Sequence, residues 1–198
     1  MDALTHIKKR FDLPEKFKSP YEVSVTREQL YDVFAELGFT KGVEVGVYRG
    51  WNAKVMCDRI PNLKLFAVDF WKGYSAKRTQ KKQDRYLRQA KRHLRNHIKN
   101  KSVKLIRKAS MAAVKDFEDE SLDFVYIDSN HNFDVVMEDI IEWSKKLRPG
   151  GIMSGHDYYR RERERGVILA VNTYVRAHRI KPWFLTSEKR KRSFFWIK

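Results

Sequence analysis

The stretch that decides the fold reads LDFVYIDSNHNFDVVMEDIIEWSKKLRPGGIMSGHDY and covers residues 122–158. Its first part, 122–128, is an apolar run of the length of a buried strand. A helix over 132–147 is then indicated, because apolar residues recur at intervals of four, three and four. These residues are Val136, Ile140, Trp143 and Leu147, while Glu138, Asp139 and Lys145 are expected on the outer faces of the helix. Pro149, Gly150 and Gly151 are expected to end that helix and to turn the chain into a second strand that finishes near 156–157.

The same alternation of short apolar runs and longer helical patterns extends over the rest of the chain, which favours βαβ units around a parallel sheet. Strands are also expected at 42–47, 63–69, 103–106, 182–186 and 193–197, the last two forming an antiparallel hairpin. Further helices are expected from the capping box of Thr26 and Gln29 to Leu37, and at 51–59, 111–117 and 167–179. We therefore predict a doubly wound α/β fold with about seven strands, as a single domain over 1–198 with a basic N-terminal arm at 1–24.

Composition limits the class of protein and its partners. The 198 residues carry a formal net charge of +17, and aromatic residues make up 13% of the chain. The positive charge favours anionic partners. The apolar and aromatic content is too high for a disordered polycation. The sequence shows no export signal and no apolar run long enough to span a membrane, so we expect a cytoplasmic protein. The single cysteine, Cys57, rules out an intramolecular disulfide and is expected to be buried and inert.

One segment, 74–100, differs from the rest because it combines many lysines and arginines with a single acid, Asp84. It is compatible with a helix, but its apolar positions form only a narrow stripe. These positions are Tyr86, Leu87, Leu94 and Ile98. Most of its charge must therefore face solvent or a partner.

Polar residues follow several predicted strands, at the edge of the sheet where doubly wound folds bind their ligands. Gly46 and Gly50 flank a strand-to-helix turn, which is either a plain tight turn or a loop that lets backbone approach a ligand. Asp69 ends the next strand and either caps a helix or accepts hydrogen bonds from ribose hydroxyls. Trp71 and Tyr74 follow it and are candidates to line a pocket, whereas the aromatic run 194–196 is expected in the core.

The runs VEVGVYRG (43–50), FAVDFW (66–71) and the 122–158 stretch resemble class I S-adenosylmethionine-dependent methyltransferases, in particular sugar and small-molecule O-methyltransferases. The resemblance implies a Rossmann-like, mostly parallel seven-stranded sheet with an antiparallel C-terminal strand. It also implies a cofactor site made of Glu44, Gly46, Tyr48, Gly50, Asp69, Ala109, Ser110 and Asp128. Asp69 would hold the ribose, Ala109 and Ser110 would border the adenine, and Asp128 would lie below the sulfonium. Many such enzymes have a third glycine in the first loop, where this chain has Tyr48.

A second group comprises Asp128, His131, His156 and Asp157, which this fold would gather around the transferring methyl group. His131 suits the role of general base near neutral pH, although it could instead cap a helix. Asp128, His156 and Asp157 could ligate Mg²⁺ or Mn²⁺, as acids at similar positions do in metal-dependent O-methyltransferases. His156 stands where those enzymes usually have a carboxylate, and its alternative role is that of a buried hydrogen bonder.

The leading functional hypothesis is methylation of a hydroxyl on a sugar, glycan or related small polar acceptor, with an anionic or nucleotide-linked substrate favoured by the charge. The second is methylation of a nucleic-acid ribose, in which 77–99 and 160–165 would follow the phosphates. The chain lacks the Asn/Asp-Pro-Pro-Tyr run associated with methylation of base nitrogens. The third is a non-catalytic module that binds the cofactor and recruits a partner.

Overall fold

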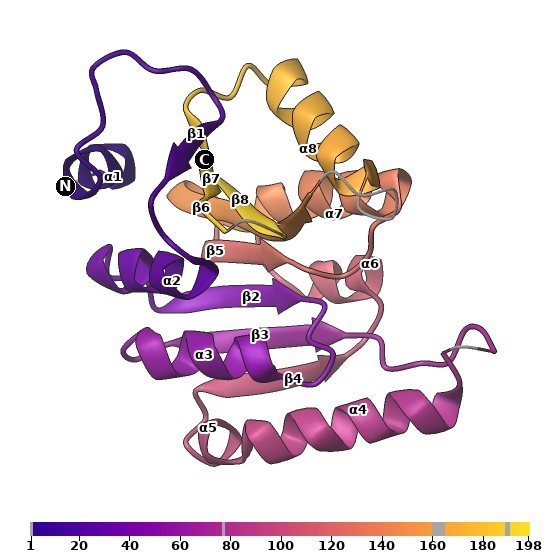
Figure 1. The fold of residues 1–198 in the computed structure, drawn as a ribbon. Helices are drawn as coiled ribbons and strands as arrows, with labels where there is room; N and C mark the ends of the chain where they lie inside the picture. Colours follow the sequence, from indigo (N-terminus) through magenta and orange to yellow (C-terminus); the bar gives the residue numbers. More distant parts are fainter. Residues whose placement is uncertain (1, 77, 160–164, 189–190) are drawn as a thin grey trace.

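The computed structural model describes residues 2–76, 78–159, 165–188 and 191–198. Its eight-stranded sheet has the order β1-β7-β8-β6-β5-β2-β3-β4 (Figure 1). The strands are β1 (Tyr21–Val23), β2 (Lys41–Val45), β3 (Lys64–Asp69), β4 (Val103–Arg107), β5 (Leu122–Ile127), β6 (Leu147–Tyr158), β7 (Trp183–Thr186) and β8 (Arg192–Ile197). β8 runs antiparallel to both β6 and β7, and the other pairs are parallel. The predicted fold class and C-terminal hairpin are confirmed.

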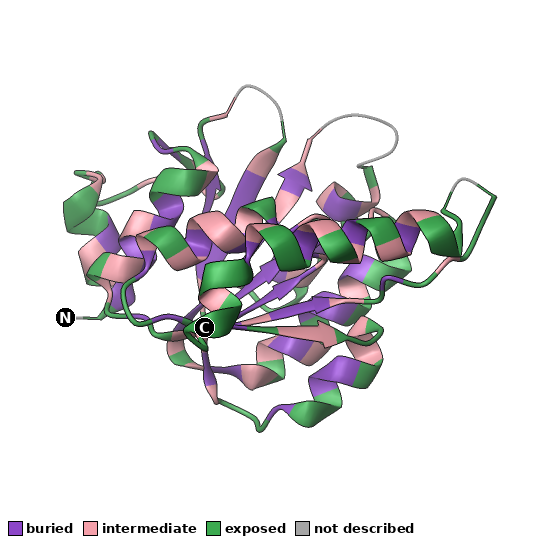
Figure 2. Cartoon of the chain, turned by 90° about the horizontal axis from the view of Figure 1, so that it is seen from below, coloured by how far each residue is buried: buried purple, intermediate pink, exposed green. Residues whose placement is uncertain are grey.

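Helices cover both faces of the sheet (Figure 1). They are α1 (Ala3–Arg10), α2 (Arg27–Glu36), α3 (Trp51–Arg59), α4 (Gln80–His93), α5 (Arg95–Lys99), α6 (Ser110–Ala113), α7 (Phe133–Lys146) and α8 (Arg165–Ala177), with the short 3-10 helix η1 (Val114–Asp116) after α6. Alternation along β5 shows the two layers: Phe124 and Tyr126 join the core under α1 to α4, whereas Val125 and Ile127 join the core under α7 and α8. Figure 2 shows the buried sheet beneath its partly exposed helices. Among the described residues, no helix has the length and apolarity needed to cross a bilayer.

The strand order shows at which edge of the sheet a ligand would bind. β2 lies between β3 and β5, so the chain changes direction across the sheet at the β2–β5 pair. Val45 is in register with Val68 on one side and Ile127 on the other, and the ends of all three strands therefore meet. Ligands of doubly wound folds bind at this point.

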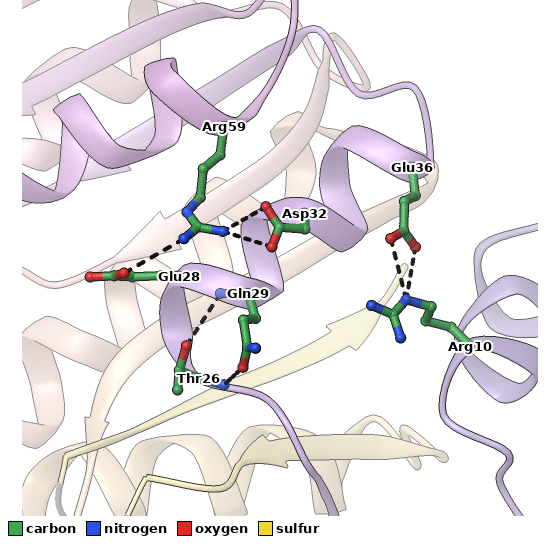
Figure 3. Close-up of polar contacts among 7 residues, drawn as sticks. All are labelled: Arg10, Thr26, Glu28, Gln29, Asp32, Glu36 and Arg59. Carbon is green, nitrogen blue, oxygen red and sulfur yellow. Dashed lines mark hydrogen bonds and ion pairs between the residues drawn. The ribbon is translucent and has the colours of Figure 1, made fainter.

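The basic N-terminal segment differs from the expected arm. It forms α1, whose Ile7 is fully buried in the core, and β1, which adds an eighth strand by pairing with β7. Arg10 and Glu36 join α1 to α2 by an ion pair of 3.2 Å (Figure 3). β1 has three residues, too few for an alternation of apolar and polar residues to reveal it in the sequence.

The predicted capping box starts α2. The Thr26 hydroxyl accepts from the Gln29 N–H, and the Gln29 side chain accepts from the Thr26 N–H (Figure 3). Arg59 of α3 contacts both carboxylate oxygens of Asp32 on α2, at 2.8 and 2.7 Å. α2 is thus fixed at its start and along its length.

Several predicted boundaries shift. β6 begins directly after α7, so the expected turn at 149–151 lies inside a strand. In the 74–100 segment the helix starts only at Gln80, after the capping residue Thr79. Ile98 is 38% exposed and does not join the buried stripe. Asp139, expected on an outer face of its helix, is fully buried.

Candidate active site

The turn after β2 is shaped by residues in left-handed backbone conformations. Gly46, Tyr48 and Gly50 have φ values of 96°, 54° and 80°. A Cβ on Gly46 would lie 2.2 Å from the carbonyl oxygen of Asp128, so only glycine lets this loop pass the end of β5. Tyr48 has a backbone conformation that favours glycine. It stands in the first loop, where many enzymes of the family that the sequence resembles have a third glycine.

Asp69 holds that turn in place. Its Oδ2 accepts from the Val47 and Tyr48 N–H groups at 3.0 and 2.7 Å, and its Oδ1 accepts from the Trp71 N–H at 3.0 Å. Burial raises the pKa of Asp69, although these hydrogen bonds oppose the rise. The side chain therefore fixes the loop, and its contact with a ribose stays a prediction.

The two aromatic residues after β3 differ from each other. Trp71 is only 1% exposed and donates from Nε1 to the Tyr48 carbonyl at 2.9 Å, so it supports the first loop from within the core. Tyr74 is 70% exposed. The aromatic run at 194–196 is buried as predicted.

Glu44 lies buried near the end of β2. Its Oε1 accepts from the Asn52 side chain at 2.8 Å, while its buried Oε2 has no hydrogen-bond partner among the described residues. Burial raises the pKa of Glu44 to about 8, and the charges of Asp128 and Asp69 add to the effect. An unpaired carboxyl oxygen at this edge is suited to receive a donor from a ligand.

The predicted group at the ends of β5 and β6 is brought together by the fold. His131 Nε2 lies 2.8 Å from Asp157 Oδ2, and His156 Nδ1 lies 3.2 Å from Asp157 Oδ1 and 3.8 Å from Asp128 Oδ2. Three ligand atoms, one each from Asp128, His156 and Asp157, all lie within 4.8 Å of one another. A cavity of about 10 Å³, enough for one water or ion, is lined by these residues and His131.

The two carboxylates of this group differ in their protonation. Burial raises the pKa of Asp128 to about 6, although the charge of His156 opposes the rise. For Asp157, burial is outweighed by hydrogen bonds with His131 and His156, so its pKa falls well below the ordinary value. Lys191 adds a positive charge 3.3 Å from Asp157 Oδ1. Asp157 is therefore an anion at any working pH, surrounded by basic groups.

Ser110, predicted beside the adenine, belongs to a buried network. Its hydroxyl donates to Asp139 and accepts from Trp143 Nε1 at 2.8 Å. Ser129, after β5, donates to the other oxygen of Asp139 at 2.7 Å. α7 thus links the loops after β4 and β5 through one carboxylate, whereas Ala109 is exposed and caps α6 through its backbone only.

Sequence reasoning missed Asp139 and Arg27. Asp139 stands three residues after Val136 and four before Trp143, so it borders the buried stripe of its helix, and this spacing was the available signal. Arg27, the first residue of α2, is brought near Tyr126, Tyr31 and Asp128, which together outweigh its burial and raise its pKa. Tyr31 is one turn further along the same helix, but Tyr126 and Asp128 lie about 100 positions away, so no local pattern reveals that Arg27 reaches the site.

Comparison with known proteins finds similarity to methyltransferases. A family model described as a methyltransferase domain matches residues 43–158. Protein y4gI of Sinorhizobium fredii is 28% identical over 131 residues, which are 63% of this chain and 14% of that protein; the chain thus matches about a seventh of the relative's length.

Solved structures resemble the fold over nearly the whole chain. An O-methyltransferase of Bacillus cereus in complex with S-adenosylhomocysteine has a TM-score of 0.63 at 15% identity, covering 99% of this chain and 89% of its own. The O-methyltransferase TomG of Streptomyces achromogenes, in complex with S-adenosylmethionine, scores 0.63 at 14% identity, covering 100% and 90%. An rRNA methylase of Streptococcus thermophilus scores 0.62 at 15% identity, covering 86% and 94%.

Proposed function

Because this chain belongs to the methyltransferase-domain family, we propose that it transfers the methyl group of S-adenosylmethionine to a hydroxyl of a sugar, glycan or related small polar acceptor. The observation that carries the proposal is the pairing of His131 with Asp157 beside Asp128, where the ends of β5 and β6 meet. A hydroxyl nucleophile needs a base at this position, whereas a bare cofactor-binding module does not.

The residues around the first loop fit the cofactor. Glu44 Oε2 is buried without a partner among the described residues and suits a donor of the ligand, and Ser110 borders the expected adenine position. When bound, S-adenosylmethionine supplies an electrophilic methyl group on a positively charged sulfur. Asp128, largely ionised at neutral pH, would favour that charge. The Bacillus cereus and Streptomyces achromogenes structures, which carry S-adenosylhomocysteine and S-adenosylmethionine, support S-adenosylmethionine as the cofactor.

His131 is proposed as the general base. A proton taken up at Nδ1 gives an imidazolium whose Nε2–H faces the Asp157 carboxylate, 2.8 Å away. Because the pKa of Asp157 is strongly lowered, this carboxylate stays ionised, orients the ring and stabilises its charged form. Asp157 is then a positioning residue for the base.

A divalent ion also fits this site. Asp157 Oδ1 faces His156 Nδ1 at 3.2 Å, and the Lys191 ammonium lies 3.3 Å from the same oxygen, which shows that this oxygen attracts a cation. Neighbouring ligand atoms around an octahedral ion lie about 3 Å apart when the bonds are about 2.1 Å long. Asp128, His156 and Asp157 would hold the ion, which would acidify the acceptor hydroxyl. An imidazole among the ligands favours Mn²⁺ over Mg²⁺.

The test combines binding and turnover. S-adenosylhomocysteine should bind with about one site per chain in a calorimetric titration, and labelled methyl should pass from S-adenosylmethionine to a member of a hydroxyl-acceptor panel. His131→Ala should keep the binding and slow transfer about 100-fold or more, as loss of a general base does. A chelator should abolish methyl transfer. Adding Mn²⁺ should then restore more of the activity than adding Mg²⁺.

The neighbouring Asn132→Ala serves as the matched control, since Asn132 caps α7 and lies outside the proposed chemistry. Equal turnover in the two variants would remove His131 from the mechanism. A folded protein that binds no S-adenosylhomocysteine would refute the proposed function.

A second candidate, a ribose hydroxyl of nucleic acid as acceptor, is favoured by the exposed lysines and arginines of α4. Lys77 and residues 160–164, which the sequence also suggested for phosphate contacts, lie outside the described residues.

A further inference from the structure

The outward face of α4 carries a line of positive charge. Lys81, Arg85, Arg88 and Arg92 are all exposed and follow one another at intervals of four, three and four, so they lie along one stripe of the helix. The stripe is about 16 Å long at the rise of an α-helix. We call these four residues the α4 stripe. Figure 2, seen from below, shows the exposed face of this long helix in front of the sheet.

The four charges of the α4 stripe have no acidic partner in the part of the chain that the structure describes. Among the described residues, no carboxylate lies within ion-pair distance of any of the four, whereas cations elsewhere, such as Lys108 and Lys146, are paired with acids. The single acid of the helix, Asp84, is paired with Arg107 at 3.0 Å. The opposite face of α4 is buried, so the stripe is held rigidly by the core.

Exposed aromatic rings lie beside this helix. Trp51 is 58% exposed, and its ring packs on His93 at the end of α4, with centroids 3.9 Å apart. The ring of Tyr48, 45% exposed, packs on Tyr86 with centroids 4.4 Å apart, but Tyr86 belongs to the buried face of α4, so Tyr48 lies on the side away from the α4 stripe. One exposed ring, Trp51, therefore lies near the end of the α4 stripe, packed on the residue that follows Arg92.

We infer that the α4 stripe, with Trp51, binds single-stranded nucleic acid. The cations would contact phosphates, and Trp51 would stack on an unpaired base, the combination that single-strand binders use. An anionic membrane fits less well, because the outward positions of the stripe are all charged and none is apolar. This binding surface is independent of which hydroxyl the enzyme methylates.

Titration of the full chain into a labelled 20-nucleotide single strand, RNA or DNA, tests the inference by fluorescence anisotropy without cofactor. Affinity should fall as salt rises. Changing all four residues of the α4 stripe to Gln should weaken binding at 100 mM salt by tenfold or more. The slope of log binding constant against log salt concentration should also become shallower, by about 0.7 for each lost phosphate contact.

The control removes four exposed charges elsewhere, at Lys8, Lys16, Lys18 and Arg176, also to Gln. Both variants have the same net charge, so equal loss of affinity in the two would refute a specific surface. Circular dichroism checks that both are folded. Failure of the wild-type chain to bind either strand would also refute the inference.

Tryptophan fluorescence separates nucleic acid from other polyanions. Of the five tryptophans, all of them described, the other four are at most 5% exposed, so quenching by a ligand at the surface reports on Trp51. An oligonucleotide should quench this emission and heparin should not, and Trp51→Phe should abolish the response. Heparin binding of equal strength with no quenching by the oligonucleotide would show a general polyanion surface and overturn the assignment.

Discussion

At the scale of single residues, Glu44 makes the clearest thermodynamic prediction. Its folded-state pKa of about 8 lies far above the ordinary 4.5 because the carboxyl is buried. Between these two values the folded chain binds more protons at this site than the unfolded chain. The free energy of unfolding therefore falls as pH rises from about 4.5 to 8 and is level above that range.

Glu44→Gln should remove this dependence. We expect the variant to match the wild type near pH 4 and to exceed its free energy of unfolding near pH 9 by up to several kcal/mol, since one pKa unit corresponds to about 1.4 kcal/mol. Urea denaturation across this pH range measures the difference. The exposed Glu15→Gln controls for charge alone, and parallel pH profiles for the wild type and Glu44→Gln would contradict the burial of an ionisable group.

Residues at strand ends were predictable from the sequence, whereas residues that reach them from other elements were not. Asp69, Asp128 and Asp157 each follow an apolar run, and parallel strands bring such positions to one edge. Arg27 lies 101 positions before Asp128 and approaches it only because α2 packs over the sheet. The direction of the Asp69 side chain, toward the backbone of the first loop, likewise depends on the folded turn.

At the scale of elements, the strands β2, β3 and β5 and the helix between β5 and β6 followed from hydrophobic periodicity, whereas the strand order in the sheet comes from the structure. The same periodicity placed Asp139 on an outer face, because a charged residue in an amphipathic helix ordinarily faces water. The structure buries it, since Ser110 and Ser129 satisfy both of its oxygens. A polar partner from another element can therefore override the pattern of a single helix.

We predict that Asp139→Ala lowers the free energy of unfolding by about 1–3 kcal/mol, because it leaves buried hydroxyl groups without their acceptor. The variant should also bind S-adenosylhomocysteine more weakly, since the loops after β4 and β5 would no longer share one anchor. Urea denaturation and calorimetric titration measure the two effects. The exposed neighbour Glu138→Ala is the matched control, and affinity equal to that control would limit Asp139 to a role in stability.

At the scale of the whole molecule, the two ends of the chain meet. β1 pairs with β7, and the Ser187 N–H donates to the Val25 carbonyl at 2.9 Å, which joins the start of the chain to the C-terminal hairpin. The sequence suggested a separate basic arm because this segment is rich in lysine and its strand is short. The three residues of β1 gain their structure from a partner strand about 160 positions away.

We propose that residues 1–24 are part of one cooperative domain with the rest of the chain. Ile7 is fully buried and packs in the same core as Phe34 and Phe184. Ile7→Ala should therefore lower the free energy of unfolding by about 2–4 kcal/mol, the usual cost of a cavity in a core. The exposed Lys9→Ala, on the same helix, should change it by less than about 0.5 kcal/mol.

The measurement should follow unfolding by tryptophan fluorescence and by circular dichroism, because every tryptophan lies outside residues 1–24. In a cooperative domain, Ile7→Ala shifts both transitions to lower denaturant together, although the substitution is remote from all five tryptophans in sequence. A fluorescence transition that stays in place while the helical signal shifts would mean that α1 unfolds by itself. In that case the N-terminal segment would be a docked appendage, and the rest of the fold would form without it.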